Sequence, residues 1–172
     1  MKFLIPILAA CLLPLTSAAT GRYFVQINGS KQGDILRSTL RGFETAAPAR
    51  GINLTISTLT DGAAGQAIGK RHYAPVSITR DIDDRSPLVI RALTTNELLK
   101  SIKVMVQQVG NNGASGSFTT VRTYEFTNAQ LVGVQHVSGL DDLVEVLTFK
   151  FQKWELKSTV GGITVGDDIT RL

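Results

Sequence analysis

The sequence predicts a mainly β domain that carries one short helix. Most of the 172-residue chain alternates apolar and polar residues with a period of two and is rich in β-branched and aromatic side chains, a pattern typical of strands. Gly-rich stretches separate these segments, and one segment carries helix start signals. Strands, then a helix, then more strands is the order of a closed barrel or a sandwich whose end is covered by the helix.

Seven segments are expected to be strands. They are 22–28, 52–57, 76–79, 102–107, 118–126, 131–132 and 143–156. In the last of these, Trp154 breaks the alternation, which predicts a bulge. The stretch Gly110–Gly113 lies between two expected strands and is typical of a hairpin connection.

The predicted helix begins at Ser86 and Pro87. Serine is a favoured N-cap residue, and proline is favoured at the first helical position. Residues 88–93 continue the helix, and 96–99 are expected to extend it.

Three acidic residues precede the predicted helix, namely Asp81, Asp83 and Asp84. A calcium loop or an acid/base pair is one interpretation of this cluster. The interpretation that we favour is electrostatic: the acids complement the helix dipole, with Arg80 and Arg85 as neighbours.

Residues 1–19 predict a cleavable signal peptide. Lys2 supplies a positive charge, 3–15 is almost wholly apolar, and 16–19 offers the small residues that signal peptidase requires. The apolar run is shorter than the ~20 residues that span a bilayer, so no stable membrane insertion is expected. The folded domain is then 20–172, in the periplasm or secreted. An alternative is a lipobox at 8–11, with a lipid on Cys11.

Cysteine and charge counts exclude several functions. Cys11 is the only cysteine, so the chain after cleavage has no intramolecular disulfide, cysteine metal site or thiol nucleophile. The formal net charge is +4 and the charges are scattered. Nucleic-acid binding calls for a strong basic stripe, so no nucleic-acid partner is expected.

No residue pattern indicates catalysis. His72 and His136 are isolated and lack the spacing of a metal site. The stretch Gly113–Gly116 is superficially like a nucleophile elbow, but it lacks the Gly-x-Ser-x-Gly spacing and the strand-to-helix context. We therefore predict no catalytic, metal or cofactor-binding residue, and a protein that is not an enzyme.

Residues 61–70 form a long segment that is rich in small residues and without periodicity. Segments of this kind in compact domains are usually functional or disordered. With catalysis poorly supported, interaction is the better hypothesis. Strand addition needs only backbone hydrogen bonds, and head-to-tail contacts generate rings or filaments.

Several motifs are shared with one known family. The central motif is 70–88, in which a basic stretch and a Pro precede an apolar strand and the sequence Asp-Asp-Arg-Ser-Pro; residues 92–101 continue it. Further matches are 147–155, the Gly161-Gly162 and Asp167-Asp168 pairs and, more loosely, 24–29. Over nearly all of the chain after the predicted signal, the sequence resembles the haemolysin-coregulated protein (Hcp) family, the tube proteins of type VI secretion.

This resemblance implies a two-sheet β-barrel with one short helix and no catalytic residues. It implies hexameric rings that stack into a tube expelled by a contractile sheath, with effectors in the lumen and a spike protein at the tip. It also implies an extended loop that reaches the next subunit or ring. The residues at that position, our expected subunit interface, are Asp61, Gly62, Ala63, Ala64, Gly65, Gln66, Ile68, Lys70 and Arg71.

The chain departs from ordinary family members at both ends. They lack a cleavable signal, and many carry an aromatic residue where this chain ends in 169–172. The alternative function is a monomeric exported module that binds a glycan or a peptide. A cell-envelope hydrolase is a third interpretation, disfavoured because no nucleophile–base pair can be named.

Overall fold

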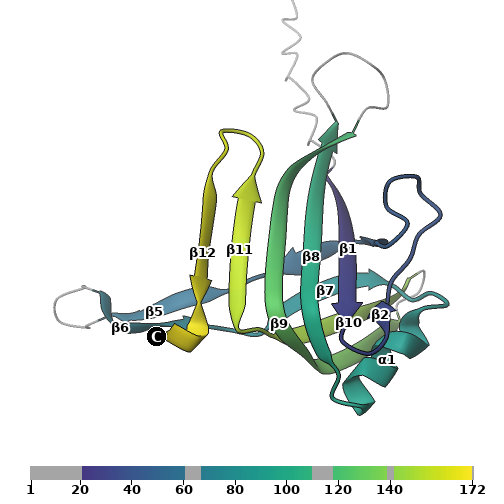
Figure 1. Cartoon of the computed structure of the whole chain (residues 1–172), viewed down its shortest axis with the longest axis horizontal. Helices are drawn as coiled ribbons and strands as arrows, with labels where there is room; N and C mark the ends of the chain where they lie inside the picture. The colour runs from purple at the N-terminus through teal and green to yellow at the C-terminus, as the bar shows by residue number, and fades with distance from the viewer. Residues whose placement is uncertain (1–20, 61–66, 110–117, 139–141, 172) are drawn as a thin grey trace, which may run out of the picture.

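The computed structural model describes residues 21–60, 67–109, 118–138 and 142–171 (Figure 1). The predicted signal peptide lies outside the described residues. The strands are β1 (Arg22–Gly29), β2 (Gly33–Asp34), β3 (Ala47–Ala49), β4 (Gly51–Asn53), β5 (Ile56–Thr60), β6 (Ala67–Tyr73), β7 (Val76–Asp81), β8 (Leu98–Val109), β9 (Phe118–Ser138), β10 (Leu143–Lys150), β11 (Lys153–Ser158) and β12 (Thr164–Asp168). One α-helix, α1 (Ser86–Thr94), separates β7 from β8, and a 3-10 helix follows β12 at Ile169–Arg171.

Within the described ranges the strands form two sheets of very unequal size. Ten strands make one sheet, with the path β2-β1-β8-β9-β10-β7-β4; β3 joins it beside β1, and β11 and β12 join it beside β9. The second sheet is the pair β5-β6 alone. The mainly β composition, the short helix and the presence of two sheets agree with the prediction, whereas a closed barrel does not emerge from this strand order.

Strand β9 is the longest and organises the large sheet. It pairs with β8 on one edge; on the other edge β11 pairs with its first half and β10 with its second half. The prediction of two separate strands, 118–126 and 131–132, was wrong. Asn128 between them takes a left-handed φ of 51°, which asparagine tolerates better than most residues, and the strand continues through it.

The predicted strand 143–156 is divided into β10 and β11. Phe151 and Gln152 lie between the two strands, and both strands run along the same edge of β9. Phe149, Phe151 and Trp154 are all buried, so the buried face shifts by one residue at this break. The irregularity that Trp154 predicts is therefore present, as a gap between strands.

The core is apolar and α1 closes one end of it. Five strands contribute to it, through buried residues that include Val25, Ile27, Ile78, Val104, Phe126, Leu147 and Phe149. From the helix, Val89 and Ala92 are buried against this cluster. Strands β7 and β10 follow the inward–outward alternation that defines one buried face of a sheet, whereas β1 buries the neighbours Phe24 and Val25.

The helix differs from the prediction at both ends. Arg85 occupies the N-cap, and Ser86 instead accepts a hydrogen bond at its hydroxyl from the Asp83 N–H, at 3.1 Å. The helix ends at Thr94, because Asn96 has a left-handed φ of 48°. Leu98 begins β8, so the expected extension over 96–99 was wrong.

Candidate assembly surface

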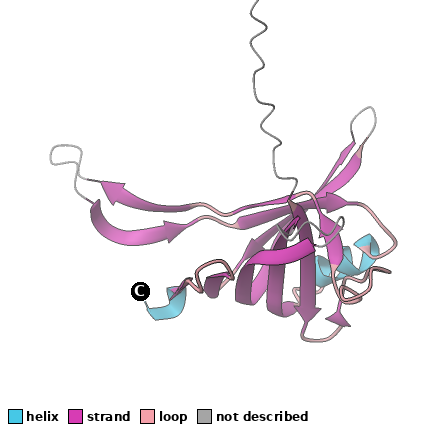
Figure 2. Cartoon of the chain, turned by 90° about the horizontal axis from the view of Figure 1, so that it is seen from above, coloured by secondary structure: helices cyan, strands magenta, loops and turns pink. Residues whose placement is uncertain are grey.

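A hairpin arm projects from the large sheet. Strands β4 and β7 pair with each other as part of the large sheet. Beyond residues 54–55 the chain continues from β4 into β5, and β6 leads through residues 74–75 into β7; β5 and β6 pair with each other. Figures 1 and 2 show this arm, made of β5 and β6, extending away from the rest of the fold. Among the described strands, β5 and β6 pair only with each other.

The arm corrects the expectation of a long irregular loop at 61–70. Residues 67–70 belong to β6, and only 61–66 separate the two strands. The period-two signal was missed there because Gly69, with a φ of 85°, and a shift of register beside Leu59 interrupt the pairing.

The predicted interface residues fall into three groups. Asp61, Gly62, Ala63, Ala64, Gly65 and Gln66 lie outside the described residues. Ile68 and Lys70 lie on β6, where Ile68 is in register with Leu59. Arg71 also lies on β6, and its guanidinium forms an ion pair with Asp167 of β12 at 2.8 Å. The Arg71–Asp167 ion pair therefore joins two parts of the same chain and is not a contact between subunits.

Two residues fix the root of the arm. The Tyr73 hydroxyl donates a hydrogen bond to the Asp167 carboxylate, which also pairs with Arg71. This hydrogen bond, the Asp168 N–H and the Arg71 charge together hold the pKa of Asp167 below its ordinary value, against the effect of burial. Burial and the contact with Asp167 raise the pKa of Tyr73. The ring of Tyr73 also packs edge-on against Phe151, with centroids 6.3 Å apart.

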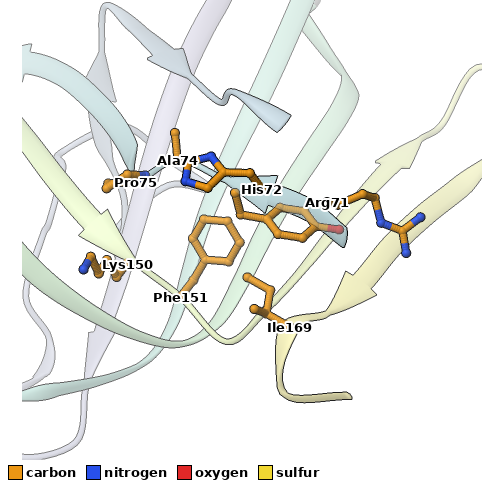
Figure 3. Close-up of a pocket in the computed structure, with 8 residues that line it drawn as sticks. Arg71, His72, Ala74, Pro75, Lys150, Phe151 and Ile169 are labelled. Carbon is orange, nitrogen blue, oxygen red and sulfur yellow. The ribbon is translucent and has the colours of Figure 1, made fainter. Parts of the chain in front are cut away.

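A cavity of about 360 Å³ lies beside β6 at the arm root. Figure 3 shows Phe151 and Ile169 at this cavity, with His72 and Lys150 also around it. Sequence reasoning missed this cavity, because Phe151 and Ile169 come from segments far from β6 in the chain. A second hollow of about 500 Å³ runs along β4 and β5, lined by Ile52, Asn53, Leu54, Ile56, Tyr124, Trp154 and Leu156.

The candidate catalytic groups are not brought together. His72 lines the cavity at the arm root, whereas His136 lies on β9 with its Nε2 3.5 Å from a Glu145 oxygen. Within the described ranges no group of three or more His, Cys, Asp or Glu residues could hold a metal ion. The helix that the structure describes is too short to cross a membrane.

The acidic cluster before α1 is engaged by arginines. Asp81 pairs with Arg50 at 2.7 Å, and Asp83 pairs with the buried Arg80. Asp83 also accepts a hydrogen bond from the Arg85 N–H at 2.9 Å. None of the acids lies in the first turn of α1, so their role is to pair with arginines and to order the turn before the helix.

The fold and this surface define a class: a mainly β protein built around a projecting arm, with no assembled catalytic group in the described part. A family model described as "Type VI secretion system effector, Hcp" matches residues 24–157. The chain belongs to the Hcp family. This family consists of structural secreted proteins of type VI secretion and is not an enzyme family.

Individual relatives agree with this assignment. The "Major exported protein" of Pseudomonas aeruginosa strain PAO1 is 27% identical over 165 residues, which cover 84% of this chain and 93% of that protein. A crystal structure of an Hcp protein superposes with a TM-score of 0.78 at 22% identity, covering 87% of this chain and 98% of the other. The secreted protein Hcp3 from Pseudomonas aeruginosa has a TM-score of 0.69 at 24% identity, covering 85% and 98%.

Proposed function

We propose that this protein is a non-catalytic subunit whose rings, hexameric as the family implies, stack into a tube that carries effectors in its lumen. The observation that carries the proposal is the arm. Its two strands pair only with each other among the described strands, and an isolated two-stranded hairpin is at best marginally stable in water. A neighbouring subunit that packs on the arm would supply the missing contacts.

The arm is also suited to strand addition. Among the described strands, no third strand pairs with the outer edge of β5 or of β6, and such edges are templates for another chain. Arg71 and Tyr73 anchor the arm root to β12 through Asp167, so the described part of the arm is presented in a defined direction. A fixed direction lowers the entropy that is lost when a neighbour binds.

We further propose that residues 1–19 are removed as a signal peptide and that the assembly acts in the periplasm or outside the cell. Within each subunit, we propose that residues 47–53 close the large sheet into a barrel. The reason is that β3, before Arg50, pairs with β1, whereas β4, after Arg50, pairs with β7. The partners in this proposal are other copies of the chain, a spike protein and secreted effectors.

The test is to express the full chain in a host with a working export pathway and purify the protein. Intact mass gives the processed N-terminus, and size-exclusion chromatography with light scattering gives the oligomeric state. Negative-stain images of the main peak should show rings or tubes. A protein that stays monomeric at high concentration and low salt, without filaments, contradicts the proposal.

The cavity at the arm root favours a second candidate function, a monomeric exported module that binds a peptide or a glycan. His72 and Lys150 border this cavity beside the ring of Phe151, which suits an acidic peptide with an apolar side chain. Thermal-shift screens against peptide and glycan panels test it. A shift that is lost in Lys150→Ala supports this function, and a flat response opposes it.

A further inference from the structure

The turn between β11 and β12 presents apolar side chains to solvent. We name residues 159–163 the prong. Val160 is 71% exposed and Ile163 is 67% exposed, and Val165, the second residue of β12, is also exposed. Single exposed apolar residues are ordinary, but adjacent ones on one projecting turn are typical of an interaction site.

Hydrogen bonds hold the prong in place. The Thr159 N–H donates to the Val121 carbonyl at 3.0 Å, and the Thr159 hydroxyl donates to the Thr120 carbonyl at 2.7 Å. The Ser158 hydroxyl donates to the Val160 carbonyl at 2.9 Å. The prong is thus bound to β9, and its apolar exposure is a feature of the folded structure.

Two glycines shape the tip of the prong. Gly161 and Gly162 have φ angles of 87° and 63°, in the left-handed region that other residues rarely adopt. The turn therefore directs Val160 and Ile163 outward without backbone strain. A rigid apolar anchor binds with less loss of conformational entropy than a mobile loop does.

A groove with a largely apolar lining lies on the opposite flank of the same sheet. It has a volume of about 550 Å³ beside β1 and β3. Two arginines, Arg22 and Arg50, also line it, and its apolar lining comes from Tyr23, Phe24, Leu40, Pro48 and Ala49. Leu40 remains 46% exposed at the groove. The groove is thus a hollow in which an exposed apolar side chain, such as those of the prong, could be buried.

The prong and the groove lie at one level along the strands. Arg22 of β1, in the groove, is in register with Gln107 of β8, and Gln107 is in register with Thr120 of β9. Thr120 is also the residue to which Thr159 of the prong is bonded. Strands β8, β9 and β11 lie between β1 and β12 (Figure 1), so the two flanks are roughly 20 Å apart at the usual strand spacing.

We propose that the prong of one copy docks in the groove of a second copy, with Ile163 beside Leu40. This inference rests on the proposed ring-forming function and names the contact between neighbours. The contact is head-to-tail, because prong and groove are different surfaces, and such contacts repeat until the rotation closes. Because both surfaces lie at one level, the repeat gains little rise along the strands, as a closed ring requires.

Charged substitutions test the contact in the protein that is expressed from the full chain and purified after export. Ile163→Asp and Leu40→Asp each place a carboxylate in the apolar contact, and each is expected to convert rings to monomers in light scattering. Leu143→Asp is the control, since Leu143 is 57% exposed on β10 and outside both surfaces; its rings should persist. Circular dichroism checks that all three variants fold.

Mixing the two monomeric variants gives a sharper result. Ile163→Asp keeps an intact groove and Leu40→Asp keeps an intact prong, so an equimolar mixture should form dimers and stop there. Rings in either single variant, or a mixture that stays monomeric, would overturn the proposed contact.

A cysteine pair tests proximity directly. Residues 20–172 contain no cysteine, so Leu40→Cys with Ile163→Cys should give a ladder of disulfide-linked oligomers under mild oxidation, whereas Leu143→Cys with Ile163→Cys should give none. If wild-type rings form but this ladder does not, the contact is wrong and the proposed function stands. If the wild-type protein forms no ring at all, the proposed function fails and the contact fails with it.

Discussion

Tyr73 on β6 donates its hydroxyl hydrogen to Asp167 on β12, a residue 94 positions further along the chain. This hydrogen bond joins the arm to the C-terminal strand of the large sheet. Arg71 pairs with the same carboxylate from the same strand of the arm. The direction in which the arm leaves the body thus depends on a side chain contributed by the end of the chain.

Tyr73→Phe removes the hydroxyl and keeps the ring against Phe151. Amide exchange in β5 and β6 should become about fivefold faster, the effect of losing one hydrogen bond of typical net strength. Exchange in β8 and β9 should not change, which hydrogen-exchange mass spectrometry can check peptide by peptide. Equal acceleration throughout the chain would mean that Tyr73 stabilises the whole fold and does not act on the arm.

The arm contact should weaken in acid. The pKa of Asp167 is lowered mainly by the hydrogen bond from Tyr73, so its contribution to stability is present above the ordinary value of about 4 and is lost as the pH falls through the lowered pKa. Arm exchange, corrected for its intrinsic pH dependence, should therefore rise below about pH 4. In Asp167→Asn this rise should disappear.

Gly166→Ala should separate β12 from β11. A Cβ at this position would lie 2.5 Å from the backbone oxygen of Trp154, and a backbone atom inside a strand pair cannot move away cheaply. We expect a lower melting temperature and weaker near-ultraviolet dichroism from Trp154. Gly133→Ala is the matched control, because its Cβ would meet only Thr148, at 3.6 Å; it should fold like the wild type.

Glu97→Ala should destabilise the β1–β2 turn. The buried Glu97 carboxylate accepts hydrogen bonds from the N–H groups of Lys31 at 2.6 Å and Gln32 at 2.8 Å. Burial alone would raise the pKa of Glu97, but these hydrogen bonds prevail and lower it. The loss should reduce the free energy of unfolding by about 3 kcal/mol in urea titrations, whereas Glu97→Gln, which keeps an acceptor, should lose less. A variant as stable as the wild type would contradict this.

Glu145→Leu should lower the free energy of unfolding by more than the change in side-chain size alone would. Glu145 is fully buried on β10 and lies 3.4 Å from the Nε of Arg80, which is 1% exposed. Removing the partner of a buried charge typically costs about 3–5 kcal/mol, and because Arg80 keeps its ion pair with Asp83, the loss should lie at the lower end of that range. The double variant Arg80→Met with Glu145→Leu should recover most of this loss in urea titrations. If both variants lose the same amount, the packing and not the charge is decisive.

Local patterns predicted the parts of the fold that depend on local causes. The alternation over 76–79 and 102–107 predicted β7 and the centre of β8 with the correct buried faces, except that Gln107 is buried as well. The same alternation places Arg80 in phase with Ile78, and Glu145 in phase with Leu147. The buried ion pair was therefore visible in the pattern, as two charges on core faces, although it was not predicted.

Other features have no local signal. The contact between Tyr73 and Asp167 joins two segments that only the folded sheet brings together. The continuity of β9 through Asn128 depends on pairing with β8, β10 and β11, which overrides the turn preference of that residue. Of the predicted interface, Asp61–Gln66 lie outside the described residues, and that assignment remains a proposal.

The long strand β9 makes the mechanical resistance of the molecule depend on the direction of the applied force. Its ladder hydrogen bonds to β8, β10 and β11 run perpendicular to the strand. A load along β9 shears many of these bonds together, whereas a load across the sheet opens them one after another from an end. The subunit should therefore resist a force along β9 better than a force that separates neighbouring strands across the sheet.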